Sequence, residues 1–274
     1  MRVAFEILPS LVTPESCLLI CELSSEGFSY VIKDDATNSF LGLAVYHFDK
    51  GTPPVGFPIA LQILFHQHPV LSKRYKRTII NYSLPESVLI PYSLFDSRRS
   101  SDFLNIIHGD LHNNDAVVTE VIQEHSMYNS FRVPAAIYEV IQAQFAGAES
   151  THQYSVLLRE ATPGNRLSVI FYTHKIVVSL VKDSVHQLVN CFPYCTADDV
   201  TYTLLNICRQ FELENVPLMI AGLLEKSSLL YQQINCYFSS IEFASLPGTQ
   251  GYNEAFAKYP SHYFSHIFAI DSCG

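Results

Sequence analysis

Residues 167–192, LSVIFYTHKIVVSLVKDSVHQLVNCF, decide the fold that this sequence predicts. The stretch holds three short apolar runs that are rich in β-branched and aromatic residues, which favour strands. Polar residues interrupt the runs at 173–175 and at Asp183-Ser184. No run is long enough for an ordinary helix, and the connections are too short for a parallel crossover. The stretch therefore predicts three antiparallel strands.

Residues 18–48 repeat the pattern of three short strands. The predicted strands are 18–23, 28–32 and 40–48. The first two are joined by the turn Ser24-Ser25-Glu26-Gly27, in which Gly27 is free to take a positive φ, because glycine reaches that region without a Cβ clash. Two stretches of the same design, one in each half, make internal duplication the main expectation.

Each half then continues with helical and strand-like segments. Apolar residues at helical spacing predict a helix over 57–65. Further predicted segments of the first half are strands at 77–82, 88–90 and 117–122 and helices at 102–107 and 134–145. In the second half, Thr196 and Asp199 have the spacing of a capping box, so a helix is predicted to begin at Thr196. After it come a strand at 216–221, a helix at 223–234 and a strand at 238–243.

The order strand-strand-strand-helix-strand-helix fits both halves. It predicts an α/β protein in which each half is a mixed sheet with packed helices. The small and polar stretch 146–153, AGAESTHQ, is the candidate boundary between them. We therefore expect two domains, 1–150 and 151–274.

The composition excludes several classes of protein. Of the 274 residues, 48% are hydrophobic, so the chain can form a packed core and is not expected to be disordered. The net charge of -9 argues against nucleic acid and against an anionic membrane surface as the main partner. No apolar run reaches the roughly 18 residues that a membrane span needs, and the first residues, MRVAFEILPS, lack the pattern of a signal peptide.

The seven cysteines are odd in number and form no C-x-x-C pair. Their spacing also differs from the arrangements that zinc sites prefer. Buried, reduced thiols are the interpretation that fits them best. Such thiols indicate a cytoplasmic protein.

One polar loop of the first half carries candidate metal ligands. His108, Asp110 and His112 lie within five residues, and no fourth ligand is identified. A polar surface loop explains the same residues. The metal site therefore stays an alternative interpretation.

Two pairs in the second half also have a functional interpretation beside a structural one. Lys175 and Asp183 are a candidate acid–base pair, although each also fits a role at the end of a strand. His262 and His266 share a helical face, but the intervening glutamate of a zinc protease is missing. For both pairs the structural interpretation is favoured.

Residues 190–202, NCFPYCTADDVTY, resemble an uncharacterised bacterial family of the actin-like ATPase superfamily. In that family a strand ending in an Asn-x-Phe-x-Tyr pattern runs into a helix that carries an Asp and a Tyr. The segment CELSSEGFSYVIKDD, residues 21–35, is similar to the family's first hairpin. The resemblance covers most of the chain and implies two ribonuclease-H-like domains of the actin-like ATPase fold.

The resemblance also implies where a nucleotide would bind. In this superfamily each domain offers phosphates a turn between its first two strands, where glycine permits close approach and backbone N–H groups point at the anion. The matching positions here are Ser24, Ser25 and Gly27 in the first turn, His174 and Lys175 in the second, and Gly222 at the adenosine site. Glu26 adds negative charge to the first turn, the second turn lacks both Asp and Gly, and Ala221 replaces a glycine.

These departures favour a binding protein over an ATPase. We expect a non-catalytic, actin-like scaffold that has no cofactor and holds a protein partner or a small ligand. The alternatives are an ATPase or phosphotransferase that uses ATP and Mg²⁺, and a metal-dependent hydrolase that uses the loop 108–115. The sequence leaves open whether the protein is an enzyme.

Overall fold

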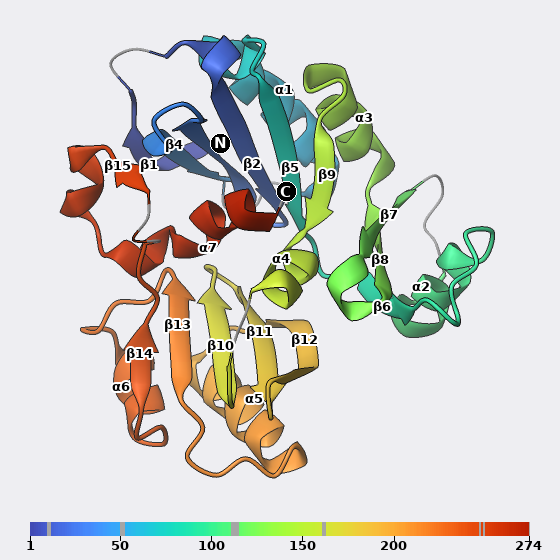
Figure 1. Ribbon diagram of the computed structural model, residues 1–274, viewed down its shortest axis with the longest axis vertical. Helices are drawn as coiled ribbons and strands as arrows, with labels where there is room; N and C mark the ends of the chain where they lie inside the picture. Colours follow the sequence, from blue (N-terminus) through green and yellow to red (C-terminus); the bar gives the residue numbers. More distant parts are fainter. Residues whose placement is uncertain are drawn as a thin grey trace. The chain divides into compact units, whose positions relative to one another are not determined.

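The structure is a computed structural model that describes residues 1–9, 12–49, 53–110, 115–160, 163–246, 248 and 250–273. The chain divides into two compact units. Unit 1 holds Met1–Arg159 and Gln250–Ala255, and unit 2 holds Glu160–Thr249 and Phe256–Gly274. The colours of Figure 1 follow the chain through both units.

The main sheet of unit 1 combines antiparallel and parallel strands. Its strands are β1 (Arg2–Ile7), β2 (Cys17–Ser24), β3 (Gly27–Asp34), β4 (Ser39–His47), β5 (Arg77–Ser83), β9 (Glu149–His152) and β15 (Gly251–Tyr252). They run in the order β1-β4-β3-β2-β5-β9, and β15 pairs with β4. The strands β1 to β4 pair antiparallel, whereas β2 with β5 and β5 with β9 are parallel. The sheet is therefore mixed, and its switch of direction lies at β2.

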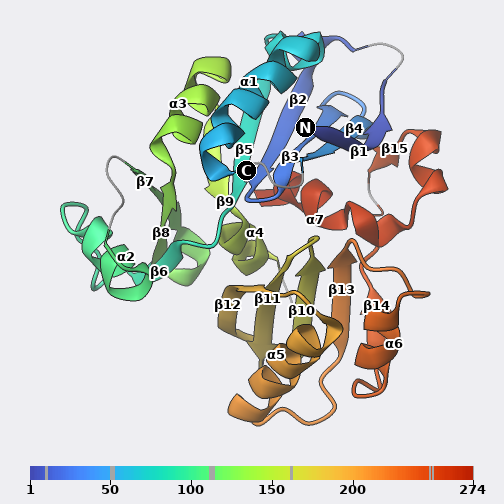
Figure 2. The same cartoon turned by 180° about the vertical axis from the view of Figure 1, so that it is seen from behind.

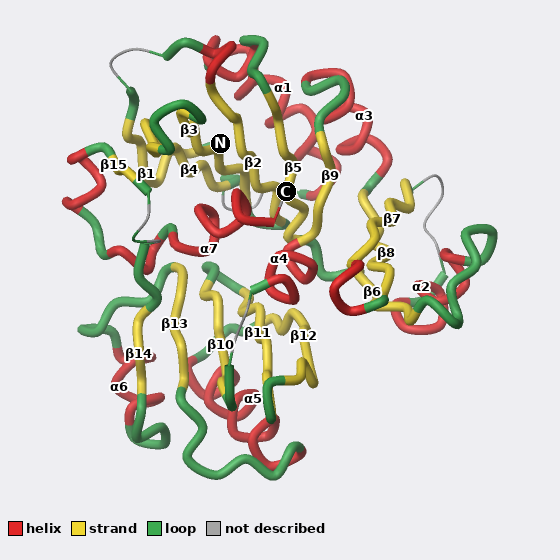
Figure 3. Tube along the Cα trace, in the orientation of Figure 1, coloured by secondary structure: helices red, strands yellow, loops and turns green. Residues whose placement is uncertain are grey.

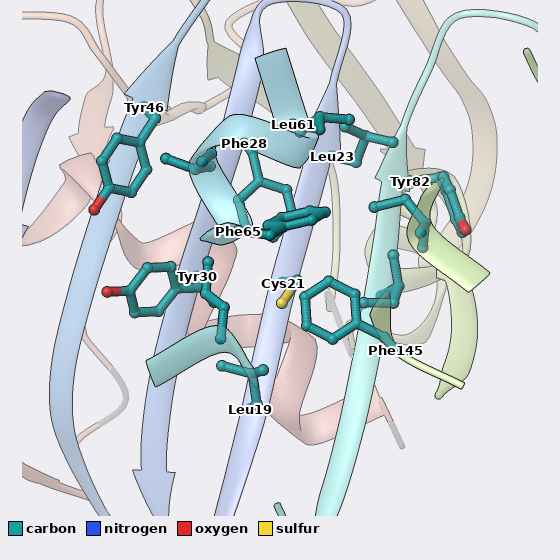
Figure 4. Close-up of a cluster of buried hydrophobic side chains, with 14 of the residues drawn as sticks. Leu19, Cys21, Leu23, Phe28, Tyr30, Tyr46, Leu61, Phe65, Tyr82 and Phe145 are labelled. Atoms are coloured by element: carbon teal, nitrogen blue, oxygen red, sulfur yellow. The ribbon is translucent and has the colours of Figure 1, made fainter. Parts of the chain in front are cut away.

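Helices α1 (Phe57–Gln67) and α3 (Ala135–Gln144) cover one face of this sheet, as Figure 2 shows. Their apolar side chains join those of the strands in one buried core, part of which appears in Figure 4. Phe28, Phe65 and Phe145 meet there with ring centroids 5.2 to 6.4 Å apart. Helix α4 (Gln153–Arg159) follows β9 and is buried along six residues, from Gln153 to Leu158.

A small antiparallel sheet is inserted between β5 and α3. It consists of β6 (Ser87–Pro91), β7 (Ala116–Ile122) and β8 (Met127–Val133) in the order β6-β8-β7. Helix α2 (Ser100–His108) lies beside it, as Figure 3 shows, and adds Leu104 to a small core with Val88 and Ile90.

The sheet of unit 2 has the same mixed design. Its strands are β10 (Arg166–Phe171), β11 (Lys175–Lys182), β12 (Val185–Pro193), β13 (Leu218–Gly222) and β14 (Ile241–Phe243). Their order is β12-β11-β10-β13-β14, in which β10, β11 and β12 are antiparallel and β10, β13 and β14 are parallel. The segment β4-β3-β2-β5-β9 of unit 1 has the same order and the same directions.

Helices α5 (Ala197–Gln210) and α6 (Leu229–Asn235) cover one face of the unit 2 sheet and close its core. Helix α7 (Ser265–Phe268) lies near the end of the chain. The 3₁₀ helices of the chain are Pro14–Ser16, Pro54–Gly56, Pro69–Ser72, Gln123–His125, Glu254–Lys258, Ser261–Tyr263 and Ala269–Cys273. Within the described ranges, no helix combines the length and the apolar character that a bilayer span requires.

The predicted α/β class and its mixed sheets are confirmed, and so are the three-strand stretches at 18–48 and 167–192. Two predicted segments of unit 2 are shorter than expected. The helix predicted over 223–234 begins only at Leu229, and the strand predicted over 238–243 is limited to Ile241–Phe243. The polar stretch 146–153, the candidate domain boundary, contains β9, which pairs with β5 through backbone hydrogen bonds that need no apolar side chains.

The turn between β11 and β12 shows how local chemistry fixes one of these hairpins. Asp183 and Ser184 have φ angles of 54° and 63°, the left-handed region that a two-residue hairpin loop requires. Asp tolerates this region better than most residues, and the Asp183 N–H donates to Asn165 Oδ1 at 2.6 Å. The turn predicted at Asp183-Ser184 is thus confirmed.

The predicted start of α5 is also confirmed. Thr196 is the N-cap of the helix, and its Oγ1 accepts a hydrogen bond from the Asp199 N–H at 3.2 Å. In return, the Thr196 N–H donates to Asp199 Oδ2 at 2.8 Å. The two residues form a complete capping box, with Asp in the place of the more usual Glu.

We predict that Thr196→Ala lowers the free energy of unfolding by about 1 kcal/mol, because the Asp199 N–H then loses its acceptor. Thr196→Ser keeps the hydroxyl and serves as the matched control, with stability close to that of the wild type. Urea unfolding followed by circular dichroism measures both. Equal losses in the two variants would contradict the capping role.

Candidate functional site

Three polar side chains lie buried where the parallel strands of unit 1 end. Glu22 is near the end of β2, Asn81 is near the end of β5, and Gln153 directly follows β9. Their exposed fractions are 3%, 0% and 1%. Because β2, β5 and β9 are parallel neighbours, their carboxyl ends meet at one edge of the sheet, where α/β proteins commonly bind ligands.

Asn81 joins the other two residues of this group. Its Nδ2 donates to Gln153 Oε1 at 2.8 Å and to Glu22 Oε2 at 3.3 Å. Within the described part of the chain, Asn81 Oδ1 and Gln153 Nε2 have no hydrogen-bond partner. One acceptor and one donor are thus left open inside the protein, an arrangement that fits a bound water or a small polar group.

The sequence patterns gave no role to Asn81 or Gln153. The missed signal is a polar residue inside an otherwise apolar strand, since such a residue is buried only where another group satisfies it. Asn81 interrupts the apolar run of β5 in this way.

The first turn, Ser24 to Gly27, closes the hairpin of β2 and β3. It begins two positions after Glu22 in the sequence. The Ser24 Oγ accepts a hydrogen bond from the Glu26 N–H at 3.1 Å and donates to the Gly27 carbonyl at 3.5 Å. The turn therefore uses its own serine side chain to satisfy the backbone N–H of Glu26. Ser25 is exposed at the tip.

Gly27 does not use its freedom to take a positive φ. It is the first residue of β3 and lies against β4, where an added Cβ would come within 1.9 Å of the Tyr46 carbonyl oxygen. The physical reason for glycine here is therefore close approach of two strands rather than the shape of the turn.

A cavity of about 240 Å³ opens beside the first turn, and we call it the turn cavity. Its apolar wall comes from Phe57 at the start of α1, Leu84 and Pro85 after β5, and Pro134 and Ile137 at the start of α3. Ser24 and Ser25 form the side that faces the turn. All of these residues belong to unit 1.

The rest of the cavity is lined by three charged residues, Glu86, Asp115 and Arg132. Arg132 is 3% exposed and its Nη1 donates to Glu86 Oε2 at 2.9 Å. Its Nη2 donates to Asn105 Oδ1 at 2.5 Å and to the Gly109 carbonyl at 2.8 Å. A buried guanidinium needs such partners, because an uncompensated charge is costly inside a protein.

The second candidate turn lies in unit 2, between β10 and β11. The Tyr172 N–H donates to the Lys175 carbonyl at 3.0 Å, which closes the turn around Thr173 and His174. The Tyr194 N–H donates to the His174 carbonyl at 2.9 Å, and the Tyr194 hydroxyl donates to the Tyr172 carbonyl at 2.7 Å. The turn is thereby fixed by the segment that follows β12.

The Lys175 side chain is 5% exposed, and its Nζ lies 4.5 Å from the centre of the Tyr172 ring. This distance is that of a cation–π contact, which favours a cation over the face of the ring. The Lys175 ammonium therefore lies against a ring at the other end of the same turn.

Gly222 ends β13 next to this turn, paired with Phe171 of β10. It has a φ of +81°, and an added Cβ would lie 2.2 Å from the Phe171 carbonyl oxygen. The same oxygen accepts a hydrogen bond from the Leu223 N–H at 2.8 Å. Gly222 is therefore required both by its backbone conformation and by the closeness of β10.

The structure places the six predicted site residues in two separate groups. Ser24, Ser25 and Gly27 share the first turn of unit 1. His174, Lys175 and Gly222 lie around the ends of β10 and β13 in unit 2. Their binding of a cofactor remains a prediction.

Lys175 and Asp183 are not brought together as catalytic groups. Lys175 begins the eight-residue strand β11 and Asp183 follows its end, so roughly 26 Å of extended chain separates them. His108 Nε2 is 3.2 Å from the Ser87 carbonyl, and His112 lies outside the described residues. Among the residues that the structure describes, no three His, Cys, Asp or Glu side chains are grouped as metal ligands.

We predict that Gly222→Ala destabilises the protein by about 2 kcal/mol or more, because alanine is strained at this φ and its Cβ clashes with Phe171. Gly164→Ala is the matched control: Gly164 has a φ of +75°, but no atom lies within 4 Å of its added Cβ. It should lose only about 1 kcal/mol. Urea unfolding measures both variants, and equal losses would show that close approach to β10 does not matter.

His266 of α7 provides a pH-dependent test of the unit 2 core. Its ring contacts the Tyr172 ring edge to face, with centroids 5.5 Å apart. Burial, followed by the charge of Lys175, lowers the pKa of His266 from 6.5 to about 3. His266 therefore stays neutral in the folded protein at a pH where an unfolded chain would protonate it.

We predict that the free energy of unfolding falls as the pH drops from 6.5 towards 3, because unfolding then takes up a proton at His266. The slope attributable to one such group approaches about 1.4 kcal/mol per pH unit. Urea unfolding at pH 7.5, 6.5 and 5.5 measures it. In His266→Gln the decline should be smaller, and a decline as steep as that of the wild type would rule out His266 as its cause.

Comparison with known structures identifies the fold. A Bacteroides thetaiotaomicron protein with an actin-like ATPase fold and unknown function matches with a TM-score of 0.80 and 18% identity, over 97% of this chain and 100% of that one. The PilM–PilN type IV pilus biogenesis complex gives 0.63 and 11%, over 94% and 98%. The ethanolamine utilization protein EutJ from Carboxydothermus hydrogenoformans gives 0.55 and 9%, over 98% and 93%.

Comparison with curated protein sequences gave no match. A family model does match: residues 10–241 fit the family described as Protein of unknown function (DUF3822). The match covers well over half of the chain and agrees with the resemblance carried by residues 190–202. The chain has the actin-like ATPase fold and belongs to the DUF3822 family.

Proposed function

We propose that this protein is a non-catalytic, actin-like binding protein that holds a protein partner or a small ligand. The observation that carries the proposal is that each candidate phosphate turn engages one of its backbone N–H groups in a hydrogen bond of its own. The Glu26 N–H is engaged by Ser24 Oγ, and the Tyr172 N–H is engaged by the Lys175 carbonyl. Phosphate-binding turns instead direct their backbone N–H groups at the anion.

Charge supports the same proposal. Glu26 places a carboxylate in the first turn, where it opposes a phosphate. Lys175 is the cation of the second turn, but its ammonium lies against the Tyr172 ring. An anion at the second turn would have to compete with that ring for the cation.

The turn cavity supports the binding side of the proposal. It is a concave and largely apolar space with a few polar groups, which is the usual character of a binding site. The similar PilM–PilN structure is a complex, so at least one protein of this fold assembles with a partner. We propose that partner binding extends to this protein.

A second candidate function is an actin-like ATPase or phosphotransferase. It is favoured by Glu22, whose carboxylate lies with Asn81 at the carboxyl ends of β2 and β5. A carboxylate at this edge is a suitable group to hold Mg²⁺ through water molecules. Binding of Mg-ATP would therefore distinguish this candidate function from the first one.

We predict that Mg-ATP binds no more tightly than about 1 mM, which corresponds to roughly -4 kcal/mol. Isothermal titration calorimetry of the purified protein is the direct measurement, with Ser25→Ala and Glu22→Gln as variants. A micromolar dissociation constant that is lost in either variant would establish the ATPase alternative instead. Circular dichroism would confirm that both variants fold.

We also propose a cytoplasmic location. All six cysteines whose side chains are described have free thiols, two of them buried and two of them exposed. Exposed thiols persist in a reducing compartment. Alkylation of the exposed Cys195 and Cys236 in intact cells, compared with the purified protein, would test this proposal.

A further inference from the structure

We propose that the turn cavity of unit 1 receives an apolar side chain from a partner protein, and that the partner carries a lysine or arginine beside that side chain. The proposal deepens the proposed function and rests on it in one respect, namely that the partner is a protein. What it adds is the chemistry of the partner's binding segment.

The size of the cavity limits what can fill it. Its volume of about 240 Å³ lies below the roughly 300–1,000 Å³ of typical small-molecule pockets. A cavity of this size accommodates one large side chain. Buried Leu84 and Ile137 form its inner wall, so the group that enters it should be apolar.

The walls are held in place before anything binds. The Phe57 ring stacks on the Phe48 ring with centroids 3.8 Å apart and an interplanar angle of 3°. Ile137 belongs to the main core of unit 1. Arg132 is fixed by three acceptors, as described above. A preformed pocket binds more tightly because little side-chain freedom is lost on association.

The charges around the cavity favour a cationic residue on the partner. Glu86 and Asp115 contribute two carboxylates and Arg132 one guanidinium, which leaves one net negative charge on the lining. The positive charge is also the less accessible one, because Arg132 is 3% exposed whereas the Glu86 side chain is 38% exposed.

Asp115 is the clearest carboxylate for such a contact. Its Oδ1 accepts a hydrogen bond from the Ala135 N–H at 3.3 Å, which orients the carboxylate at the start of α3. A lysine or arginine on the partner would then meet a fixed negative charge beside the apolar wall. An acidic segment would meet repulsion at the same place.

The test uses a library of random heptapeptides displayed on phage and panned on the full-length protein. Clones that also bind Ile137→Trp are removed, because the larger side chain fills the cavity. We expect the remaining sequences to share a Leu, Ile, Phe or Met next to Lys or Arg. Synthetic peptides of these sequences, titrated by calorimetry, should lose affinity by about tenfold or more in Ile137→Trp.

A second variant that blocks the cavity separates loss of binding from loss of folding, since overpacking at Ile137 costs stability. Ser25→Tyr changes an exposed residue at the rim and should block the same peptides. Ile63→Trp is the matched control: Ile63 lies on the outer face of α1, is 52% exposed and does not line the cavity. It should leave peptide binding unchanged.

Asp115→Asn tests the charge separately, because asparagine keeps an oxygen acceptor for the Ala135 N–H. It should weaken the basic peptides by about threefold and leave uncharged analogues unaffected. Selected sequences that are acidic, that lack an apolar residue, or that bind all variants equally would overturn the inference. Enrichment of no peptide, with binding of a neutral probe such as toluene, would overturn it in favour of a small apolar ligand.

The two proposals fail in different ways. Micromolar binding of Mg-ATP would refute the proposed function and leave the peptide result standing. Absence of peptide binding, with no binding of Mg-ATP, would refute only the inference about the turn cavity.

Discussion

The structure of each unit depends on one central strand that pairs in two directions. In unit 1 this strand is β2, which pairs antiparallel with β3 and parallel with β5, and all eight of its residues are buried. In unit 2 the strand β10 has the same two kinds of neighbour. A strand of this kind sets the order of the whole sheet, because a hairpin must lie on one side and a crossover on the other.

This constraint explains why polar groups collect at the end of the central strand. The chain leaves a sheet at the carboxyl ends of its parallel strands, so Glu22, Asn81 and Gln153 come together although they lie far apart in sequence. Burying them without partners would be costly, and their mutual hydrogen bonds offset part of that cost. The turn cavity forms at the same end, since Ser24 ends β2 and Leu84 directly follows β5.

Local chemistry was enough to predict the hairpins and the start of α5. The strand runs, the Asp183-Ser184 turn and the Thr196–Asp199 capping box each depend on residues within a few positions of one another. Strand β9 was missed because its sequence, ESTH, is polar, and only pairing with β5 makes it a strand. The cavity could not be predicted from the sequence for a similar reason, because its lining residues lie far apart in the chain, from Ser24 to Ile137. Gly27 was singled out correctly as special, but for the wrong physical reason.

The bonds of Arg132 have a consequence for how the small sheet is attached. One guanidinium contacts Glu86 in the loop before β6, Asn105 within α2 and the carbonyl of Gly109 just after α2. The wall of the cavity and the far end of α2 are therefore joined through a single side chain. Loss of the Arg132 guanidinium would therefore remove both its contact with α2 and its contact with the end of that helix at once. The same helix exposes Ile106 and Ile107 on its surface.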